Sequence, residues 1–403
     1  MMERQWLPAE TPVQIIDRLA APACFVYREG MAVRVVKISG QPGDLDRIRE
    51  AASIVDAGGL VAFPTETVYG IACRVRRDAL ARLDDIKGRD VNKHYTLHIG
   101  QIEEYRRYVP HAGLRADKLA RQAWPGPLTL IFRLEPSPMA EQKKRIDSDA
   151  LDVLYKNNSI GIRCPDHPVA SLLLRSTKSP VVAPSANLSG RDPAVNADQA
   201  LSQLGGCIDL VLDGGPCKYG KSSTVAAVNA RGVEVLRQGI YSQDQLQTMS
   251  QLAFLFVCTG NTCRSPMAEG LFRKHLAEKI GCGIDELEAL GYKVLSAGTM
   301  DMAGMPASIE AISACGQKGV DLEEHMSRRL TRPLIEASDL IFCMARSHCD
   351  QVISLLPEAE GKCSLLAGDH EIPDPIGRPQ AYFDHCADLI EAAVKARVRE
   401  LVL

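Results

Sequence analysis

The chain has 403 residues, of which 46% are hydrophobic and 24% are charged, and its formal net charge is −3. This length is enough for two or three ordinary domains, each with its own hydrophobic core. A net charge so close to zero argues against bulk attraction to nucleic acid or to a membrane surface. No apolar stretch approaches the ~20 residues of a membrane span, so we expect a cytoplasmic protein that does not bind membranes.

The thirteen cysteines and nine histidines are scattered along the chain. Neither set shows the paired spacing of a disulfide framework or of a zinc site. We therefore predict no structural metal, and we expect most cysteines to be small buried side chains in a reducing compartment. Cys343 and Cys349 could form a pair, but a cysteine at a strand end and one in a helix are more typical of a core.

Residues 1–32 carry no clear signal, and alternating strand and helix patterns begin at residue 33. Apolar residues recur at helical spacing over 45–55 and 80–86, which predicts a helix in each range. The alternation predicts an α/β domain with a twisted mixed sheet over 33–247. Its expected strands are 33–38, 60–63, 95–99, 128–132, 159–163, 181–183, 210–212 and 224–228.

A polar stretch at 241–251 follows, and it is either a short helix or a linker. Beyond it, residues 253–403 alternate again and end in a helix from about 380 to 401. This repetition predicts a second domain with a doubly wound parallel sheet and a site at the carboxyl end of its first strand. The strands expected in this domain are 254–257, 293–296 and 340–343.

A loop after the strand at 254–257 carries Cys258 and, six residues later, Arg264. A helical pattern follows the loop at once. Backbone N–H groups of such a loop, with the helix N-terminus, bind an anion and favour thiolate over thiol. Arg264 can hold two oxygens of a phosphoryl group. These parts predict a phosphatase with Cys258 as its nucleophile.

The loop, the stretch at 296–299 and Asp374 late in the chain resemble the low-molecular-weight phosphatases, and the match covers 253–403. The catalytic residues would be Cys258, which attacks phosphorus, Arg264, which holds the equatorial oxygens, and Asp374, the general acid. The phosphate-loop and substrate-selecting residues would be Thr259, Gly260, Asn261, Thr262, Cys263 and Ser265.

Two loop residues have roles that follow from their chemistry. Asn261 would adopt a left-handed turn, which asparagine tolerates. Ser265 would donate a hydrogen bond to the Cys258 sulfur. Cys263 either forms a reversible disulfide with Cys258, which would protect the nucleophile from over-oxidation, or packs in the loop as a small side chain. A redox or anion-sensing loop with little turnover is a further alternative.

Thr262 bears on the substrate. Tyrosine phosphatases of this family usually have a bulky aliphatic residue at this position and aromatic residues after the Asp-Pro pair, where this chain has Ile376, Gly377 and Arg378. The loop resembles that of the protein-arginine phosphatases, in which the threonine admits phosphoarginine. The resemblance implies phosphorylated proteins as substrates and favours phosphoarginine, with phosphotyrosine as the alternative.

Polar clusters in the first domain flank glycine and proline at loop positions. The cations between residues 87 and 93 suit a polyphosphate, and Arg163 at a strand end could hold a carboxylate. Ser185 and Asn187 could bind a small polar ligand. No Walker-type glycine loop is present, which argues against an ordinary P-loop NTPase. Any one cluster alone would be read as a solvated helix end or a turn.

Four motifs, at 59–70, 124–129, 184–190 and 236–239, resemble those of the YrdC-type threonylcarbamoyl-AMP synthases and occur in the family order. The resemblance implies that L-threonine, bicarbonate and ATP, the last with Mg²⁺, give threonylcarbamoyl-AMP and pyrophosphate. This product feeds the machinery that modifies an adenosine beside the tRNA anticodon. Catalysis would rest on positioning and charge stabilisation, without a covalent nucleophile.

Site residues follow from the same motifs. The residues implied in threonine binding are Thr65, His98, Arg163 and Ser185. The residues implied in ATP binding are Lys87, Arg89, Lys93, Ser159, Asn187 and Arg237. The family usually has proline where Asp90 stands. The alternative is therefore a nucleotide- or RNA-binding module beside a phosphatase that is the only active domain.

Overall fold

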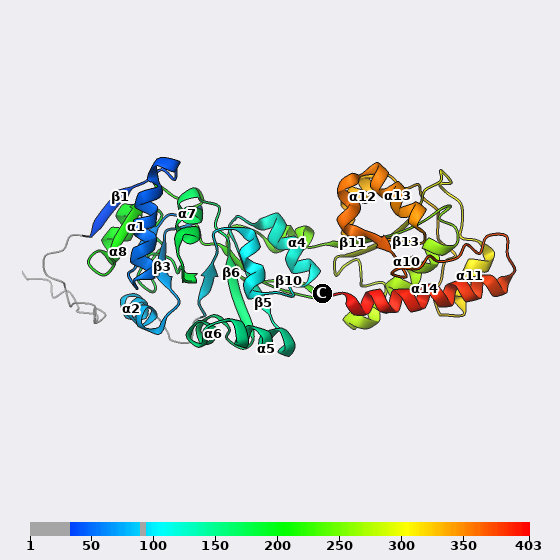
Figure 1. The fold of residues 1–403 in the computed structure, drawn as a ribbon, viewed down its shortest axis with the longest axis horizontal. Helices are drawn as coiled ribbons and strands as arrows, with labels where there is room; N and C mark the ends of the chain where they lie inside the picture. Colours follow the sequence, from blue (N-terminus) through cyan, green and yellow to red (C-terminus); the bar gives the residue numbers. More distant parts are fainter. Residues whose placement is uncertain (1–32, 89–93) are drawn as a thin grey trace, which may run out of the picture.

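The computed structural model describes residues 33–88 and 94–403 and contains two α/β domains side by side (Figure 1). The strands of the first domain are β1 (Arg34–Lys37), β2 (Val61–Phe63), β3 (Gly70–Arg74), β4 (Thr96–His98), β5 (Leu128–Arg133), β6 (Ser159–Arg163), β7 (Val181–Val182), β8 (Leu210–Asp213), β9 (Thr224–Asn229) and β10 (Gly232–Arg237). They follow the order β1-β8-β2-β3-β7-β4-β6-β5-β9-β10. Parallel and antiparallel pairs both occur, so the predicted mixed sheet is confirmed.

Helices cover this sheet. They are α1 (Leu45–Asp56), α2 (Arg77–Lys87), α3 (Tyr105–Tyr108), α4 (Leu114–Ala123), α5 (Pro136–Arg145), α6 (Ser148–Leu154), α7 (Pro168–Ser176), α8 (Ala197–Leu204) and α9 (Gln243–Met249), with short 3₁₀ turns at Pro42–Asp44 and Ile102–Glu104. Helix α1 shows the pattern, since Ile48, Ala52 and Val55 recur at helical spacing and are buried. The chain leaves this helix through Gly58, whose φ of 95° is left-handed.

The second domain has four strands, all parallel, in the order β12-β11-β13-β14. They are β11 (Leu252–Cys258), β12 (Tyr292–Gly298), β13 (Leu340–Cys343) and β14 (Cys363–Leu365). Its helices are α10 (Arg264–Ile280), α11 (Ile309–Gly316), α12 (Arg332–Ala337), α13 (Arg346–Leu355) and α14 (Gln380–Glu400), with a 3₁₀ turn at Pro357–Lys362.

Strand β11 is buried along its whole length because helices cover both faces of the sheet. Phe254 and Phe256 pack in the core that contains α10, α11 and α14. Leu255 and Val257 point to the opposite face and pack against α12 and α13. This arrangement is the predicted doubly wound parallel sheet, and it explains why the strand reads as a continuous apolar run.

All the predicted strands are present within one or two residues of their expected ends. Three strands were not predicted: β3 and β10, which contain glycine, and β14, which has three residues. The polar stretch at 241–251 forms α9, whose N-terminus is closed by a capping box between Ser242 and Gln245. Within 33–88 and 94–403, no helix has the length and apolar character needed to cross a membrane.

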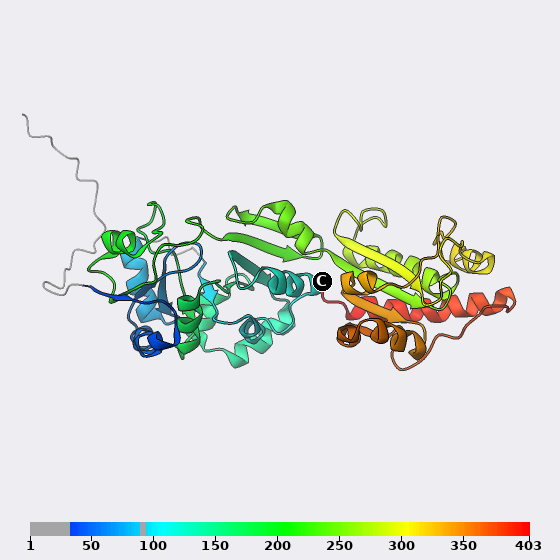
Figure 2. The ribbon, with the colours of Figure 1, turned by 90° about the horizontal axis from the view of Figure 1, so that it is seen from above.

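The two domains are joined by specific contacts as well as by the chain. Arg115 of α4 is fully buried; its Nη2 donates to the Leu290 carbonyl at 2.8 Å and its guanidinium lies 4.6 Å from the Tyr292 ring centroid. Lys118 forms an ion pair of 2.8 Å with Asp339 of the second domain. In Figure 2 the green segment of β9, β10 and α9 lies between the bulk of the first domain and the second domain.

Candidate functional site

A polar cavity of about 300 Å³ lies in the first domain, where several strands end. It is lined by hydroxyl, amide and cationic side chains, among them Thr65, Lys87, His98, Thr129, Arg163, Ser185, Asn187, Ser223 and Arg237. Among the described lining residues there is no aspartate or glutamate. The wall is therefore suited to a ligand that carries carboxylate or phosphate groups.

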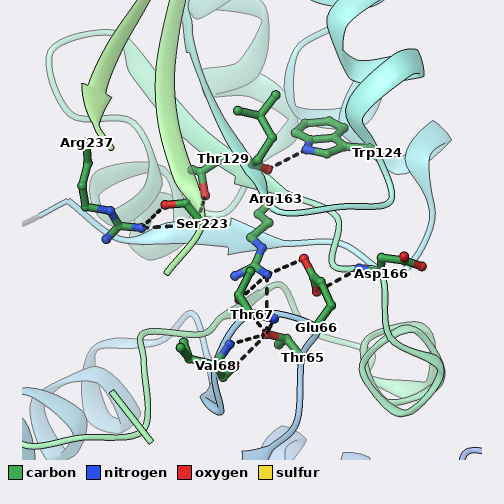
Figure 3. Close-up of polar contacts among 11 residues, drawn as sticks. Thr65, Glu66, Thr67, Val68, Trp124, Thr129, Arg163, Asp166, Ser223 and Arg237 are labelled. Carbon is green, nitrogen blue, oxygen red and sulfur yellow. Dashed lines mark hydrogen bonds and ion pairs between the residues drawn. The ribbon is translucent and has the colours of Figure 1, made fainter. Parts of the chain in front are cut away.

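Arg163, at the carboxyl end of β6, is held by the loop that follows β2 (Figure 3). Its Nη2 donates to Glu66 Oε1 at 2.8 Å and to Thr67 Oγ1 at 2.7 Å. The second carboxylate oxygen of Glu66 accepts from the Asp166 N–H at 3.0 Å. The side chains of Arg163 and Glu66 are 6% and 2% exposed. A buried pair with these extra hydrogen bonds holds the guanidinium in one orientation at the cavity wall.

His98 lies beside Arg163 in the parallel pair of β4 and β6. Burial, together with the charge of Arg163, lowers the pKa of His98 to about 3, so the imidazole is neutral at physiological pH. Its Nδ1 lies 3.1 Å from the Thr96 carbonyl and must donate to it. Because a neutral imidazole has only one N–H, Nε2 is left as a hydrogen-bond acceptor. His98 can therefore accept a hydrogen bond from an ammonium or a hydroxyl group.

Lys87 ends α2 and binds the loop that contains Ser185 and Asn187. Its Nζ donates to the Ser185 carbonyl at 2.5 Å and to the Asn187 carbonyl at 2.7 Å. The Asn187 amide donates to the carbonyls of Leu188 and Arg191 at 2.8 and 2.7 Å. Among the described atoms, Asn187 Oδ1 is buried without a hydrogen-bond partner. An unsatisfied acceptor of this kind at a cavity indicates a place for a ligand donor.

A chain of polar side chains forms another part of the wall (Figure 3). Arg237 Nη2 donates to the Ser223 carbonyl at 2.9 Å and to its Oγ at 3.2 Å. Ser223 Oγ lies 3.1 Å from Thr129 Oγ1. Burial, with the charge of Arg163, lowers the pKa of Arg237. Two arginines thus face one cavity, which further favours an anionic ligand.

The second site is the loop between β11 and α10. Cys258 Sγ lies 3.0 Å from Ser265 Oγ and accepts the Asn261 N–H at 3.3 Å. Asn261 Oδ1 accepts the Arg328 N–H at 2.8 Å, which orients the amide so that its Nδ2 donates to Ser265 Oγ at 2.9 Å. The Ser265 proton is then available to the Cys258 sulfur. Both contacts stabilise negative charge on that sulfur.

Arg264 is buried at the first residue of α10 and reaches across the loop. Its Nη1 donates to the Ile372 carbonyl at 3.1 Å and its Nη2 to Thr259 Oγ1 at 3.3 Å. Nη2 also forms an ion pair with Asp374, whose side chain is 41% exposed. The arginine and the acid, 110 residues apart in the chain, therefore meet at the loop.

His348 supports the loop from α13. The Ala345 N–H donates to its Nδ1 at 3.1 Å, so Nε2 carries the proton and donates to Thr259 Oγ1 at 3.0 Å. Burial and the charge of Arg264 lower the pKa of His348, which keeps it neutral. Burial raises the pKa of the Cys263 thiol, whose sulfur lies 3.4 Å from Ser308 Oγ.

Gly298, at the end of β12, packs directly against the backbone of the loop. A Cβ at this position would lie 2.7 Å from the Thr259 carbonyl oxygen and 2.9 Å from the Gly260 carbonyl carbon. The next N–H groups, of Thr299 and Met300, donate to the Cys258 and Thr259 carbonyls at 2.9 and 3.0 Å. Any side chain larger than hydrogen would displace the loop.

Two family models match the chain. One is described as “Telomere recombination” (Sua5/YciO/YrdC) and matches residues 53–239. The other is described as “Low molecular weight phosphotyrosine protein phosphatase” and matches residues 253–402.

The relatives divide in the same way. The chain is 29% identical to the threonylcarbamoyl-AMP synthase of Bacillus subtilis over 68% of this chain and 79% of that protein. It is 34% identical to the putative threonylcarbamoyl-AMP synthase of Mycobacterium tuberculosis (strain H37Rv) over 49% and 87%, respectively. It is 37% identical to Etp, a low molecular weight protein-tyrosine-phosphatase of Escherichia coli (strain K12), over 38% of this chain and 99% of that protein. The chain belongs to both families.

Some relatives of the synthase family extend beyond the segment that matches this chain. The match covers 65% of the synthase of Pyrococcus abyssi and 49% of that of Schizosaccharomyces pombe. Among solved structures, the phosphatase domain is similar to Wzb of Vibrio vulnificus in complex with benzylphosphonate, with 32% identity over 38% of this chain and 99% of that one and a TM-score of 0.33. The YwlE arginine phosphatase of Geobacillus stearothermophilus is 30% identical over 37% of this chain and 92% of that one, with a TM-score of 0.32.

In the synthase domain, the structure brings most of the predicted site residues to one cavity. Those that line it are Thr65, Lys87, His98, Arg163, Ser185, Asn187 and Arg237. Ser159 is not among its lining residues; it begins β6, at the far end of that strand from Arg163, and its Oγ donates to the Lys156 carbonyl at 2.8 Å. Its role in ATP binding stays a prediction. Arg89 and Lys93, with Asp90, lie outside the described residues.

In the phosphatase domain, the predicted loop residues and Asp374 are adjacent, and Asn261 has the predicted left-handed conformation, with φ of 56°. The sequence did not predict roles for Glu66 and Ser223 in the first site or for His348 in the second. Each acts through a partner far away in the chain. The only signal was the presence of Glu66 and Ser223 in polar loops.

Proposed function

We propose that the first domain synthesises threonylcarbamoyl-AMP from L-threonine, bicarbonate and ATP. The observation that supports this most strongly is the convergence of Thr65, His98, Arg163 and Ser185 on one cavity. Arg163 would hold the threonine carboxylate. Nε2 of His98 would accept a hydrogen bond from the threonine ammonium or hydroxyl. Arg237 and Lys87 would stabilise the phosphates, together with the predicted residues Arg89 and Lys93.

The reaction needs no nucleophile from the protein. A carbamate formed on the threonine nitrogen attacks the α-phosphorus, and the bond to pyrophosphate breaks. The chain contributes by holding the two reactants in line and by offsetting negative charge. We propose that Mg²⁺ enters on the ATP. The described lining residues offer hydroxyls but no carboxylate, so the ion would be held mainly by phosphate oxygens and water.

The test is pyrophosphate release by the full chain carrying Cys258→Ser, which removes phosphatase turnover. We expect release that requires threonine, bicarbonate and ATP together and that is lost in Arg163→Ala. The matched control is Arg133→Ala, at an exposed strand end. ATP binding without pyrophosphate release would instead support the nucleotide- or RNA-binding module.

We propose that the second domain dephosphorylates proteins through a cysteinyl-phosphate and prefers phosphoarginine. The contact of Cys258 with Ser265 and the Arg264–Asp374 pair support the reaction. The Cys258 sulfur attacks phosphorus as the P–N bond breaks, and the leaving guanidine nitrogen takes the Asp374 proton. Water, activated by the Asp374 carboxylate, then hydrolyses the S–P bond and releases phosphate.

The preference for phosphoarginine rests on Thr262, which is half-buried in the loop, with its Oγ1 3.6 Å from Cys263 Sγ. A hydroxyl here can bond to a guanidinium, whereas a larger aliphatic side chain would offer a wall to a phenol ring. The residue after Pro375 is Ile376, which is 67% exposed and is not an aromatic that could stack on phenol. The rival substrate is phosphotyrosine.

The test compares kcat/KM for two peptides of one sequence that carry phosphoarginine or phosphotyrosine. We expect phosphoarginine to be preferred, and Thr262→Ile to shift the ratio toward phosphotyrosine by ~10–200-fold, the range for a change of one methylene-sized group in a pocket. Thr262→Ser, which keeps the hydroxyl, should shift it less. A wild-type preference for phosphotyrosine would overturn the assignment.

The partners follow from these substrates. The first product would be consumed by the tRNA-modification machinery, and the second domain would act on phosphorylated proteins. We propose that the protein acts in the cytoplasm.

A further inference from the structure

Three cysteines of the phosphatase domain lie together outside the site described above. Cys343 ends β13, Cys349 lies in the first turns of α13, and Cys363 begins β14. Their three sulfur atoms all lie within 4.8 Å of one another, and those of Cys343 and Cys363 are 3.7 Å apart. All three are free thiols. The fold of the sheet and its connections therefore brings three sulfur atoms, which are soft metal ligands, close together.

The separation of the Cys343 and Cys363 sulfurs is that of two thiolates on one metal ion, and the Cys349 sulfur lies within 4.8 Å of both. A Zn–S bond is about 2.3 Å long, so two sulfur ligands of a tetrahedral zinc lie about 3.8 Å apart. Three sulfurs in a trigonal plane at the same bond length would lie about 4.0 Å apart. A disulfide instead needs two sulfurs at about 2.05 Å, and it would leave the third cysteine without a partner.

The surroundings favour a soft cation. Cys343 is fully buried, while Cys349 and Cys363 are half-buried, so an ion can enter from their side. The core around them is apolar and includes Val352 and Leu356. Thiolates in such surroundings select Zn²⁺ and Cu⁺ over cations that prefer oxygen ligands.

We propose that Cys343, Cys349 and Cys363 bind one thiophilic cation, Zn²⁺ or Cu⁺, through three thiolates. The spacing of these cysteines in the chain matches no common zinc pattern, and this is why the sequence predicted no structural metal. The site does not depend on the phosphatase or synthase reaction.

The position of this site gives it a structural role. Cys343 pairs with Val257, the residue before the nucleophile, in the β11–β13 ladder. Cys349 follows His348, which donates to Thr259 of the active-site loop. A bound ion would tie β13, α13 and β14 together directly behind that loop. Since a ligand that binds only the folded state stabilises it, the ion should raise the melting temperature.

The test uses the full chain in a Cys258→Ser background, so that the active-site thiolate does not compete. The reduced, metal-free protein is titrated with Co²⁺, a spectroscopic substitute for Zn²⁺, and separately with Cu⁺ against a chromophoric chelator. We expect one equivalent to bind, with an intense sulfur-to-cobalt charge-transfer band in the Co²⁺ arm if the site takes Zn²⁺. Binding only in the Cu⁺ arm would assign the site to that ion.

The matched variants are Cys349→Ser, Cys363→Ser and the control Cys282→Ser, all at half-buried positions. Loss of a ligand should weaken binding by more than the ~10–100-fold typical of a residue outside the coordination sphere, and should abolish the rise in melting temperature. The control should bind as the parent does. Absence of binding in both arms by the parent, or unchanged affinity in both ligand variants, would overturn the proposal.

Discussion

The two sites differ in how far apart their residues lie along the chain. In the phosphatase domain, residues 258–265 supply most of the site from one short segment, and Asp374 and His348 are among the groups that reach it from elsewhere. In the synthase domain, the central ion pair joins Glu66 to Arg163 across 97 residues, and Arg237 comes from a third segment. A loop site depends mainly on local backbone geometry, whereas the cavity depends on how the strands of a ten-stranded sheet are ordered.

The largest expected effect separates the two sites outright. Cys258→Ser should lower phosphatase turnover on the order of 10⁶-fold, the scale reported when a covalent catalyst loses its nucleophile. Pyrophosphate formation by the first domain should not change, because none of residues 258–265 is among the described residues that line the cavity. Both rates are measured on the full chain. Cys282→Ser is the control, and a parallel loss of both activities would show that the sites are not independent.

The next effect tests Asp374, which lies far along the chain from the rest of the phosphatase site. Asp374→Asn should lower turnover by ~10²–10⁴-fold for a substrate with a poor leaving group, because the leaving atom is no longer protonated. With p-nitrophenyl phosphate, whose leaving group needs little protonation, the loss should be much smaller. Asp369→Asn, at an exposed position nearby, is the control. Equal losses with both substrates would contradict the role of general acid.

A third effect tests the long-range pair of the synthase domain. Glu66→Ala leaves the Arg163 charge buried and unpaired, which should lower the free energy of unfolding of that domain by about 3–5 kcal/mol. Urea unfolding is followed by the fluorescence of the buried Trp124 in a Trp6→Phe background, since these are the only two tryptophans.

The control for that measurement is Glu141→Ala. Glu141 pairs with Arg145 on the surface, with side chains 46% and 55% exposed, so its loss should cost less than about 1 kcal/mol. Similar losses in the two variants would show that the buried pair has no special weight in the fold.

The smallest effect concerns pH. Since the pKa of His98 is lowered from 6.5 to about 3 in the folded chain, the unfolded chain binds a proton below pH 6.5 that the folded chain does not. Stability therefore falls as the pH falls from 6.5 toward 3, by about 1 kcal/mol between pH 6.5 and 5.5. His98→Gln should lack this part of the pH dependence, measured by urea unfolding at several pH values. His111→Gln, with its side chain 60% exposed in the wild type, should keep it; identical profiles in the two variants would refute the assignment.

Much of the fold could be predicted because strands covered on both faces read as apolar runs. Strands β11 and β13 are examples, and residues 340–343 were predicted to the residue. Strand β3 was missed because its glycine and alanine weaken the local strand signal, and its pairing with β2 supplies the order. Strand β10 alternates apolar and polar residues at Val233, Glu234 and Val235, so the sequence did carry a signal for it.

The sequence by itself determined the phosphatase loop, since Cys258, Asn261, Arg264 and Ser265 lie within eight consecutive residues and their spacing alone predicts a loop that can surround an anion. Only the tertiary structure decided which distant groups serve each site. Glu66 meets Arg163, His348 meets Thr259, and three cysteines meet at β13 and β14 because the sheets bring those segments together. The physical reason is that hydrogen bonds, ion pairs and metal ligation act over a few ångströms in space, regardless of distance along the chain.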